Sequence, residues 1–166
     1  GHHAVVDLMY EQVKTPFVLR CEDHWKFTSV DFLPAAISLL HQEDVVSTVC
    51  LRALADFHLD AHQAAKVTNR LASDGQRYYD LTGIHPQWHG YTFNPHLAPL
   101  SIWQGIGGFS KFKKERHVSR HLRSQGLRVA YLHSGYCEHI GEDASVANPP
   151  KRPWYKRLFN GRASAS

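Results

Sequence analysis

The chain has 166 residues, a net charge of +4 and an apolar fraction of 43%, the size and composition of one globular domain with a real core. Its three cysteines are widely spaced, which argues against a disulfide framework or a zinc knuckle and favours a reducing compartment. No apolar run approaches the roughly 18 residues of a membrane-spanning helix and no signal-peptide pattern is visible, so we expect a cytoplasmic protein.

The first third of the sequence predicts an alternation of helices and strands. Apolar residues recur at helical intervals from Ala4 to Lys14, and the proline that follows Thr15 ends this segment. The apolar run from Phe17 to Leu19 predicts a buried strand. Ser29 or Asp31 then caps a helix that closes near His41, and the Val-rich run from Asp44 to Leu51 predicts a second strand. This order is typical of an α/β protein with a parallel sheet.

The middle of the sequence has weaker signals. We interpret Leu59 to Leu71 as a helix and Ser73 to Gly75 as a turn. The aromatic segment from Trp88 to Phe93 predicts a strand, which Asn94-Pro95-His96 interrupts. This part of the chain therefore contributes a helix, a turn and one strand to the expected fold.

Turn and capping residues delimit the elements of the last third. Ser101 can cap a short helix through Ile106, and a turn follows at Gly107-Gly108-Phe109. The clearest amphipathic helix runs from Lys113 to Gln125, with Gly126 as its C-cap, and Leu127 to Leu132 is the expected last strand.

Proline and basic residues mark the expected end of the domain. We place one domain at residues 1–147 and a basic tail at 148–166, where cations alternate with aromatic residues. The tail either packs on the domain or contacts a phosphate-rich surface, so peripheral contact with a membrane is one expectation. The chain has no recognisable nucleic-acid-binding motif, and we expect no nucleic-acid partner.

An acidic run follows the first predicted strand. Glu22 and Asp23 would project from the carboxyl end of that strand, where α/β folds bind ligands. Carboxylates suit Mg²⁺ or Mn²⁺, and His24 adds an imidazole that Mn²⁺ also accepts. An alternative is that the two acids only cap the following turn.

The segment from Thr15 to Trp25 resembles a segment of family-2-type GT-A glycosyltransferases. In that family a Thr-Pro-Tyr-Val stretch leads into an Asp-x-Asp-like signature. Downstream, Gly107-Gly108-Phe109, Glu115 and a final strand follow in the order of that family, and His139 stands where a metal-binding histidine often follows. The resemblance covers about three quarters of the chain, from Pro16 to Gly141.

The resemblance implies a GT-A-like, Rossmann-like mixed sheet flanked by helices. It implies transfer of a sugar from a nucleotide-diphosphate sugar to a carbohydrate, lipid or protein acceptor, with inversion and with Mn²⁺ or Mg²⁺ as cofactor. Glu115 would be the catalytic base. The metal ligands would be Glu22, Asp23, His24 and His139. The substrate-binding residues would be Trp25, Trp88, Asn94, Trp103, Gly107 and Gly108.

The sequence departs from the family at two positions, which keeps a second function open. His24 stands where the family commonly has Asp, and Arg116 replaces the second residue of its usual acidic pair. The strands that hold the nucleotide would lie before Gly1, so we expect an incomplete domain. The alternative to an enzyme is a non-catalytic carbohydrate- or partner-binding remnant of the fold.

Several residues also have simpler interpretations. Glu115 can be an ordinary acid at a helix start, and the tryptophans can belong to the core. His85, His89 and His96 lie close in sequence, but without paired spacing histidines are more often surface residues than metal ligands.

Overall fold

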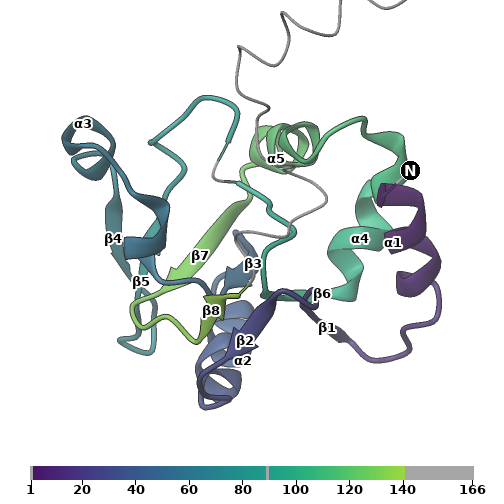
Figure 1. The fold of residues 1–166 in the computed structure, drawn as a ribbon, viewed down its shortest axis with the longest axis horizontal. Coiled ribbons are helices and arrows are strands. Elements are labelled where there is room, and N and C mark those ends of the chain that lie inside the picture. The colour runs from purple at the N-terminus through teal and green to yellow at the C-terminus, as the bar shows by residue number, and fades with distance from the viewer. Residues whose placement is uncertain (1, 89, 141–166) are drawn as a thin grey trace, which may run out of the picture.

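The computed structural model describes residues 2–88 and 90–140. They form a mixed α/β fold in which helices flank a six-stranded mixed sheet, with a separate two-stranded sheet at one end (Figure 1). The expected mixed sheet between helices is confirmed. The predicted tail at 148–166 lies outside the described residues.

The six-stranded sheet has the order β1-β6-β3-β7-β5-β4. These strands are β1 (Phe17–Arg20), β6 (His96–Pro99), β3 (Val46–Cys50), β7 (Arg128–Leu132), β5 (Arg77–Asp80) and β4 (Thr68–Leu71). Only the β3–β7 pair is parallel, and the other four neighbouring pairs are antiparallel, so the parallel sheet predicted from the order of helices and strands is wrong. The second sheet pairs β2 (Trp25–Phe27) with β8 (Cys137–His139) in antiparallel register.

Helices cover the two faces of the sheet because its central strands are apolar on both sides. The helix α2 (Phe32–Gln42) packs on one face, where Val49, Ala130 and Leu132 point. The alternate residues Cys50 and Tyr131 point to the other face, as the two-residue period of a strand requires. All five residues of β3 are buried, which is typical of a central strand covered on both sides.

A second apolar cluster joins the three remaining long helices. The helices α1 (His2–Tyr10), α4 (Leu100–Ile106) and α5 (Glu115–Ser124) meet around Phe109, which is 1% exposed and begins the 3-10 turn η2 (Phe109–Lys111). The helix α5 ends in a Schellman motif, because the amide of Leu127 bonds to Leu122 and that of Gly126 to Arg123. Gly126 has φ +78°, so the predicted C-cap is confirmed.

The predicted helix from Leu59 to Leu71 is wrong. Helix is confined to α3 (Ala61–Ala64), which follows the 3-10 turn η1 (Leu54–Phe57) and opens with a capping box between Asp60 and Gln63. The residues after Val67 instead pair as β4 with β5 around the predicted turn. Pairing with distant β7 stabilises this hairpin, and single-sequence periodicity does not report such long-range contacts.

The predicted strand from Trp88 to Phe93 is also wrong, because side chains of α5 bind its backbone groups. Glu115 accepts from the amide of Phe93, Ser119 donates to the carbonyl of Tyr91, and Arg123 donates to that of Trp88. The strand begins instead at His96, directly after Pro95, where the proline has no ladder bond to donate.

The other predicted elements have small boundary changes. The first helix ends at Tyr10 rather than Lys14, because the amides of Gln12 and Val13 bond three residues back to Met9 and Tyr10. The helix predicted from Lys113 begins at Glu115. Within residues 2–88 and 90–140, no helix has the length and apolar character needed to span a membrane.

Candidate functional site

The two-stranded sheet brings the acidic run and His139 together. The chain leaves β1 at Arg20, passes through Glu22, Asp23 and His24, and enters β2. Trp25 faces His139 in the β2–β8 register. The rings of His24 and His139 consequently lie with their centroids 5.1 Å apart in an edge arrangement. Sequence patterns contain no signal for this short sheet.

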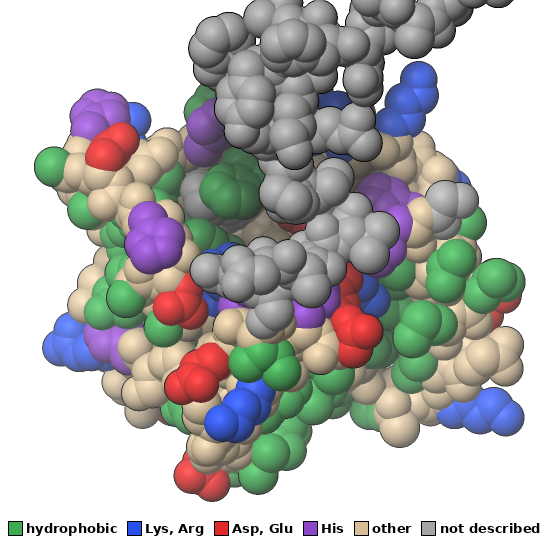
Figure 2. Space-filling view, viewed as in Figure 1, with side chains coloured by type: hydrophobic (Ala, Val, Ile, Leu, Met, Phe, Trp, Pro, Cys, Tyr) green, Lys and Arg blue, Asp and Glu red, His purple; other side chains and the backbone are tan. Residues whose placement is uncertain are grey.

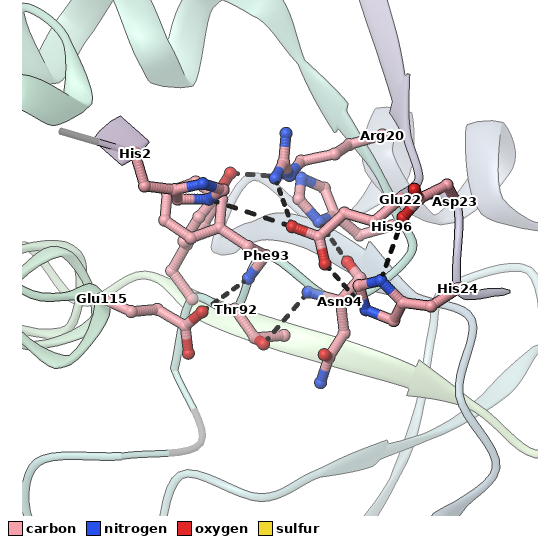
Figure 3. Close-up of polar contacts among 11 residues, drawn as sticks. His2, Arg20, Glu22, Asp23, His24, Thr92, Phe93, Asn94, His96 and Glu115 are labelled. Atoms are coloured by element: carbon pink, nitrogen blue, oxygen red, sulfur yellow. Dashed lines mark hydrogen bonds and ion pairs between the residues drawn. The ribbon is translucent and has the colours of Figure 1, made fainter. Parts of the chain in front are cut away.

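Glu22 is the centre of the polar contacts in this cluster (Figure 3). Its Oε1 accepts a hydrogen bond from Nη2 of Arg20 at 2.9 Å, and its Oε2 lies 3.1 Å from Nε2 of His24. The other ring nitrogen of His24 lies 3.3 Å from Oδ1 of Asp23. Arg20 is 6% exposed and its guanidinium lies 4.7 Å from the centre of the Phe93 ring, so a buried cation fixes the direction of the Glu22 carboxylate.

The donor groups of this cluster fit a divalent cation in kind. Two carboxylates and two imidazoles are ligands that Mn²⁺ accepts. Both nitrogens of His24 contact carboxylates, so its imidazole occupies the place between the acids that a cation would take. In the part of the chain that the structure describes, no three His, Cys, Asp or Glu side chains are arranged as a ligand shell. The cluster therefore supplies suitable donor types but not their arrangement around an ion.

Glu115 lies on the other side of the 92–94 segment from Glu22 (Figure 3). Its Oε2 accepts the amide of Phe93 at 2.9 Å. Burial raises the pKa of Glu115 above its usual range, and the negative charge of Glu22 adds to this shift; hydrogen bonds from the Phe93 backbone and from the Thr92 and Trp88 side chains oppose it. A half-buried carboxyl group with a raised pKa is suited to proton transfer.

A pocket of about 420 Å³ opens beside the acidic run. Trp25 and Asn94, two of the predicted substrate-binding residues, line it. The full lining is His24, Trp25, Arg52, Asp56, His58, Asn94, Glu138 and His139. Arg52 donates to the backbone carbonyl of Asp56 at 3.0 Å, and its guanidinium lies over the rings of Trp25 and Phe57. The pocket is therefore polar and holds a rigidly placed cation.

Trp103, Gly107 and Gly108 are not brought to this pocket. Trp103 and Gly108 lie against Asp7 of α1, whose carboxylate accepts from the Trp103 indole and from the amides of Phe109 and Ser110 at 2.7 to 2.8 Å, whereas Gly107 lies beside the Lys111 side chain. Gly108 has φ +92°, and a Cβ there would lie 3.0 Å from Asp7. Although burial favours protonation, these hydrogen bonds lower the pKa of Asp7. The Gly-Gly turn thus serves to join α1 to α4.

Sequence reasoning missed three residues that build the site: Arg20, Arg52 and His96. Arg20 ends β1 and Arg52 comes shortly after β3, and a single cation at the end of a predicted strand is the only signal that the sequence contains. His96 is fully buried rather than on the surface. Its Nδ1 lies 2.7 Å from the carbonyl of Asn94 and its Nε2 lies 3.2 Å from the Tyr91 hydroxyl. These two contacts fix both ends of the 91–94 segment.

The arrangement combines donor groups of the kind that bind cations, a half-buried carboxyl group and a polar pocket. Five separate parts of the chain supply it: residues 20–25, 52–58 and 92–96, Glu115 and β8. Comparison of the chain with protein-family models, with curated proteins and with solved structures finds no match.

Proposed function

We propose that the protein is a GT-A-like glycosyltransferase that moves a sugar from a nucleotide-diphosphate sugar to an acceptor hydroxyl. The observation that carries this proposal is the convergence of Glu22, His24 and His139 with Glu115 around the 92–94 segment. Metal-dependent sugar transfer requires a cation site for the diphosphate and a separate carboxylate for the acceptor proton. In this proposal Glu22, His24 and His139 serve as the cation site and Glu115 as the carboxylate.

Glu22, Asp23, His24 and His139 would hold Mn²⁺ or Mg²⁺. The bound ion would neutralise the charge that develops on the departing diphosphate. Arg52 lines the adjacent pocket and offers a fork of donors that suits phosphate oxygens. Arg20 directs the Glu22 carboxylate by its 2.9 Å hydrogen bond.

Glu115 is the proposed base. The acceptor hydroxyl must lose its proton as its oxygen attacks the anomeric carbon, and the carboxylate of Glu115 takes that proton. Its raised pKa makes it a stronger base than an exposed carboxylate. Arg116, the next residue, is exposed, whereas Glu115 points toward the 92–94 segment. The base is therefore proposed at position 115 and not at position 116.

One observation favours the second candidate, a non-catalytic carbohydrate- or partner-binding protein. His24 contacts both Glu22 and Asp23 through its two ring nitrogens, so both carboxylates have a side-chain partner without a metal. In this case the pocket beside Trp25 would bind a sugar by stacking and hydrogen bonding alone.

The test is to incubate the protein with a panel of nucleotide sugars, with and without Mn²⁺, and to follow binding and hydrolysis. We expect a Mn²⁺-dependent response that Glu22→Ala weakens at least about 10-fold. Glu11→Ala is the matched control, since Glu11 is exposed and outside the cluster. Metal-independent sugar binding without hydrolysis would support the second candidate. No response to any donor in the presence of Mn²⁺ would sink the transferase proposal.

A further inference from the structure

A second, apolar groove lies between the 3-10 turn η1, the helix α3 and the β4–β5 hairpin. Its volume is about 600 Å³, and it is lined mainly by aliphatic and aromatic side chains: Leu54, Ala55, His58, Leu59, Ala64, Val67, Asn69 and Tyr79. This volume lies within the usual range for small-molecule sites, about 300 to 1,000 Å³. None of the groups proposed above for metal binding or proton transfer lies in it.

The walls of the groove are held in place by specific contacts. On the hairpin side, His133 stacks on Tyr79 with centroids 4.2 Å apart and planes 5° from parallel, and its Nε2 lies 3.2 Å from Oδ1 of Asn69. On the η1 side, Phe57 meets the ring of buried Tyr131 edge-on at 5.3 Å. The groove is therefore preformed, which lowers the entropy cost of filling it.

The groove adjoins the polar pocket at His58. This residue lines both cavities, and the turn before it supplies Leu54 and Ala55 to the groove and Asp56 to the pocket. His58 has φ +45° and, in the described ranges 2–88 and 90–140, no other residue apart from glycines has a positive φ. Backbone strain of this kind clusters at ligand sites, and here it stands at the boundary between a polar and an apolar cavity.

We propose that the acceptor is a small amphiphile, with its hydroxyl-bearing end in the polar pocket and an alkyl or aryl group in the groove. This inference rests on the proposed transferase function. A purely polar acceptor would gain nothing from a groove lined by Leu59, Val67 and Tyr79. An alkyl chain leaves water on entering it, and the gain in affinity grows with each methylene that is buried.

The test measures binding of methyl, hexyl and octyl β-D-glucoside, each below its micelle concentration, by calorimetry and by NMR shifts. We expect affinity to rise by up to about fourfold per methylene, with the largest shifts at Leu59, Val67 and Tyr79. Ala64→Glu places a charge at the groove and should abolish the dependence on chain length. Ala65→Glu is the matched control, because Ala65 is equally exposed on the next residue but does not line the groove.

The outcomes separate this inference from the function on which it rests. Equal affinities for the three glucosides would overturn it, and a Mn²⁺-dependent response to nucleotide sugars in the same preparation would leave the transferase proposal standing. A chain-length effect in a protein that binds no nucleotide sugar would overturn the acceptor role. A dimer that Ala64→Glu dissociates, with no chain-length effect, would assign the groove to a second copy and overturn the inference.

Discussion

Protonation of His96 is expected to weaken the fold between about pH 6.5 and pH 4. This imidazole is fully buried beneath the 91–94 segment. Burial is the main cause that lowers the pKa of His96 from an ordinary 6.5 to about 4; the charge of Arg20 acts in the same direction, and hydrogen bonds to the Asn94 and Thr92 backbone oppose it. The folded protein therefore holds His96 neutral at a pH where the unfolded chain has already protonated it.

The sign and size of the effect follow from linkage. Because the folded pKa is depressed, His96 contributes stability that is fully present above pH 6.5 and is lost as the pH falls toward 4. One proton taken up on unfolding changes the free energy of unfolding by about 1.4 kcal/mol per pH unit. Across the whole window the loss should be roughly 2 to 3 kcal/mol, a large fraction of the stability of a typical domain.

Urea unfolding followed by circular dichroism at several pH values between about 4 and 7.5 measures this effect. His96→Gln should be less stable at neutral pH but should lose the dependence in this window, so the difference between the two proteins isolates the histidine. Glu115, whose pKa is raised, contributes with the opposite sign in both proteins and cancels. Equal slopes in both proteins would refute the assignment of His96 as a buried neutral imidazole.

Three further predictions concern the turn around Asp7 and the proposed base. Asp7→Ala should cost about 3 kcal/mol, because it removes three hydrogen bonds and leaves the buried Phe109 amide unpaired; Asp7→Asn should cost less, both measured by urea unfolding. Gly108→Ala should cost more than the roughly 1 to 2 kcal/mol of left-handed strain expected for Gly126→Ala, since only Gly108 faces Asp7. Glu115→Gln should lower kcat about 10² to 10⁴-fold with little change in donor binding, and the acid limb of the wild-type pH–rate profile should lie above that of an exposed carboxylate.

One outcome would contradict each of these three predictions. Equal stability of wild type and Asp7→Ala would remove the structural explanation of the Gly-Gly turn. Equal costs at Gly108 and Gly126 would show that contact with Asp7 is unimportant. Full activity of Glu115→Gln would mean that another group takes the acceptor proton.

Local signals in the sequence predicted the elements whose boundaries are set locally. The helix α5 has a strong apolar period and a glycine at its C-terminal cap, and β3 and β7 are short segments rich in β-branched and apolar residues; all three form as expected. The hairpin β4–β5 and the irregular 88–93 segment were missed for one reason. Their backbone partners lie far along the chain, in β7 and in side chains of α5, and periodicity contains no record of them.

The candidate site was predictable only in part, on the same grounds. The position of Glu22 after an apolar strand follows from the sequence, because the strand is recognisable and the acids come next. The proximity of His139 depends on the three-residue strands β2 and β8, which are too short to show a period of two. Trp103 was predicted to bind substrate, but its indole N–H donates a hydrogen bond to Asp7, ninety-six positions earlier. The ring therefore has a structural role, which the composition of the sequence does not show.

The most direct test of the account is a Mn²⁺ titration followed by electron paramagnetic resonance, with and without a nucleoside diphosphate. The account predicts that wild type binds Mn²⁺ and that the diphosphate tightens this binding, because the protein's side chains and the diphosphate would share one ion. Glu22→Ala and His139→Ala should each weaken Mn²⁺ binding about 10-fold or more, whereas Glu11→Ala should not. Wild-type binding that neither variant changes, or a diphosphate without effect on Mn²⁺ affinity, would contradict the proposed metal-dependent transferase.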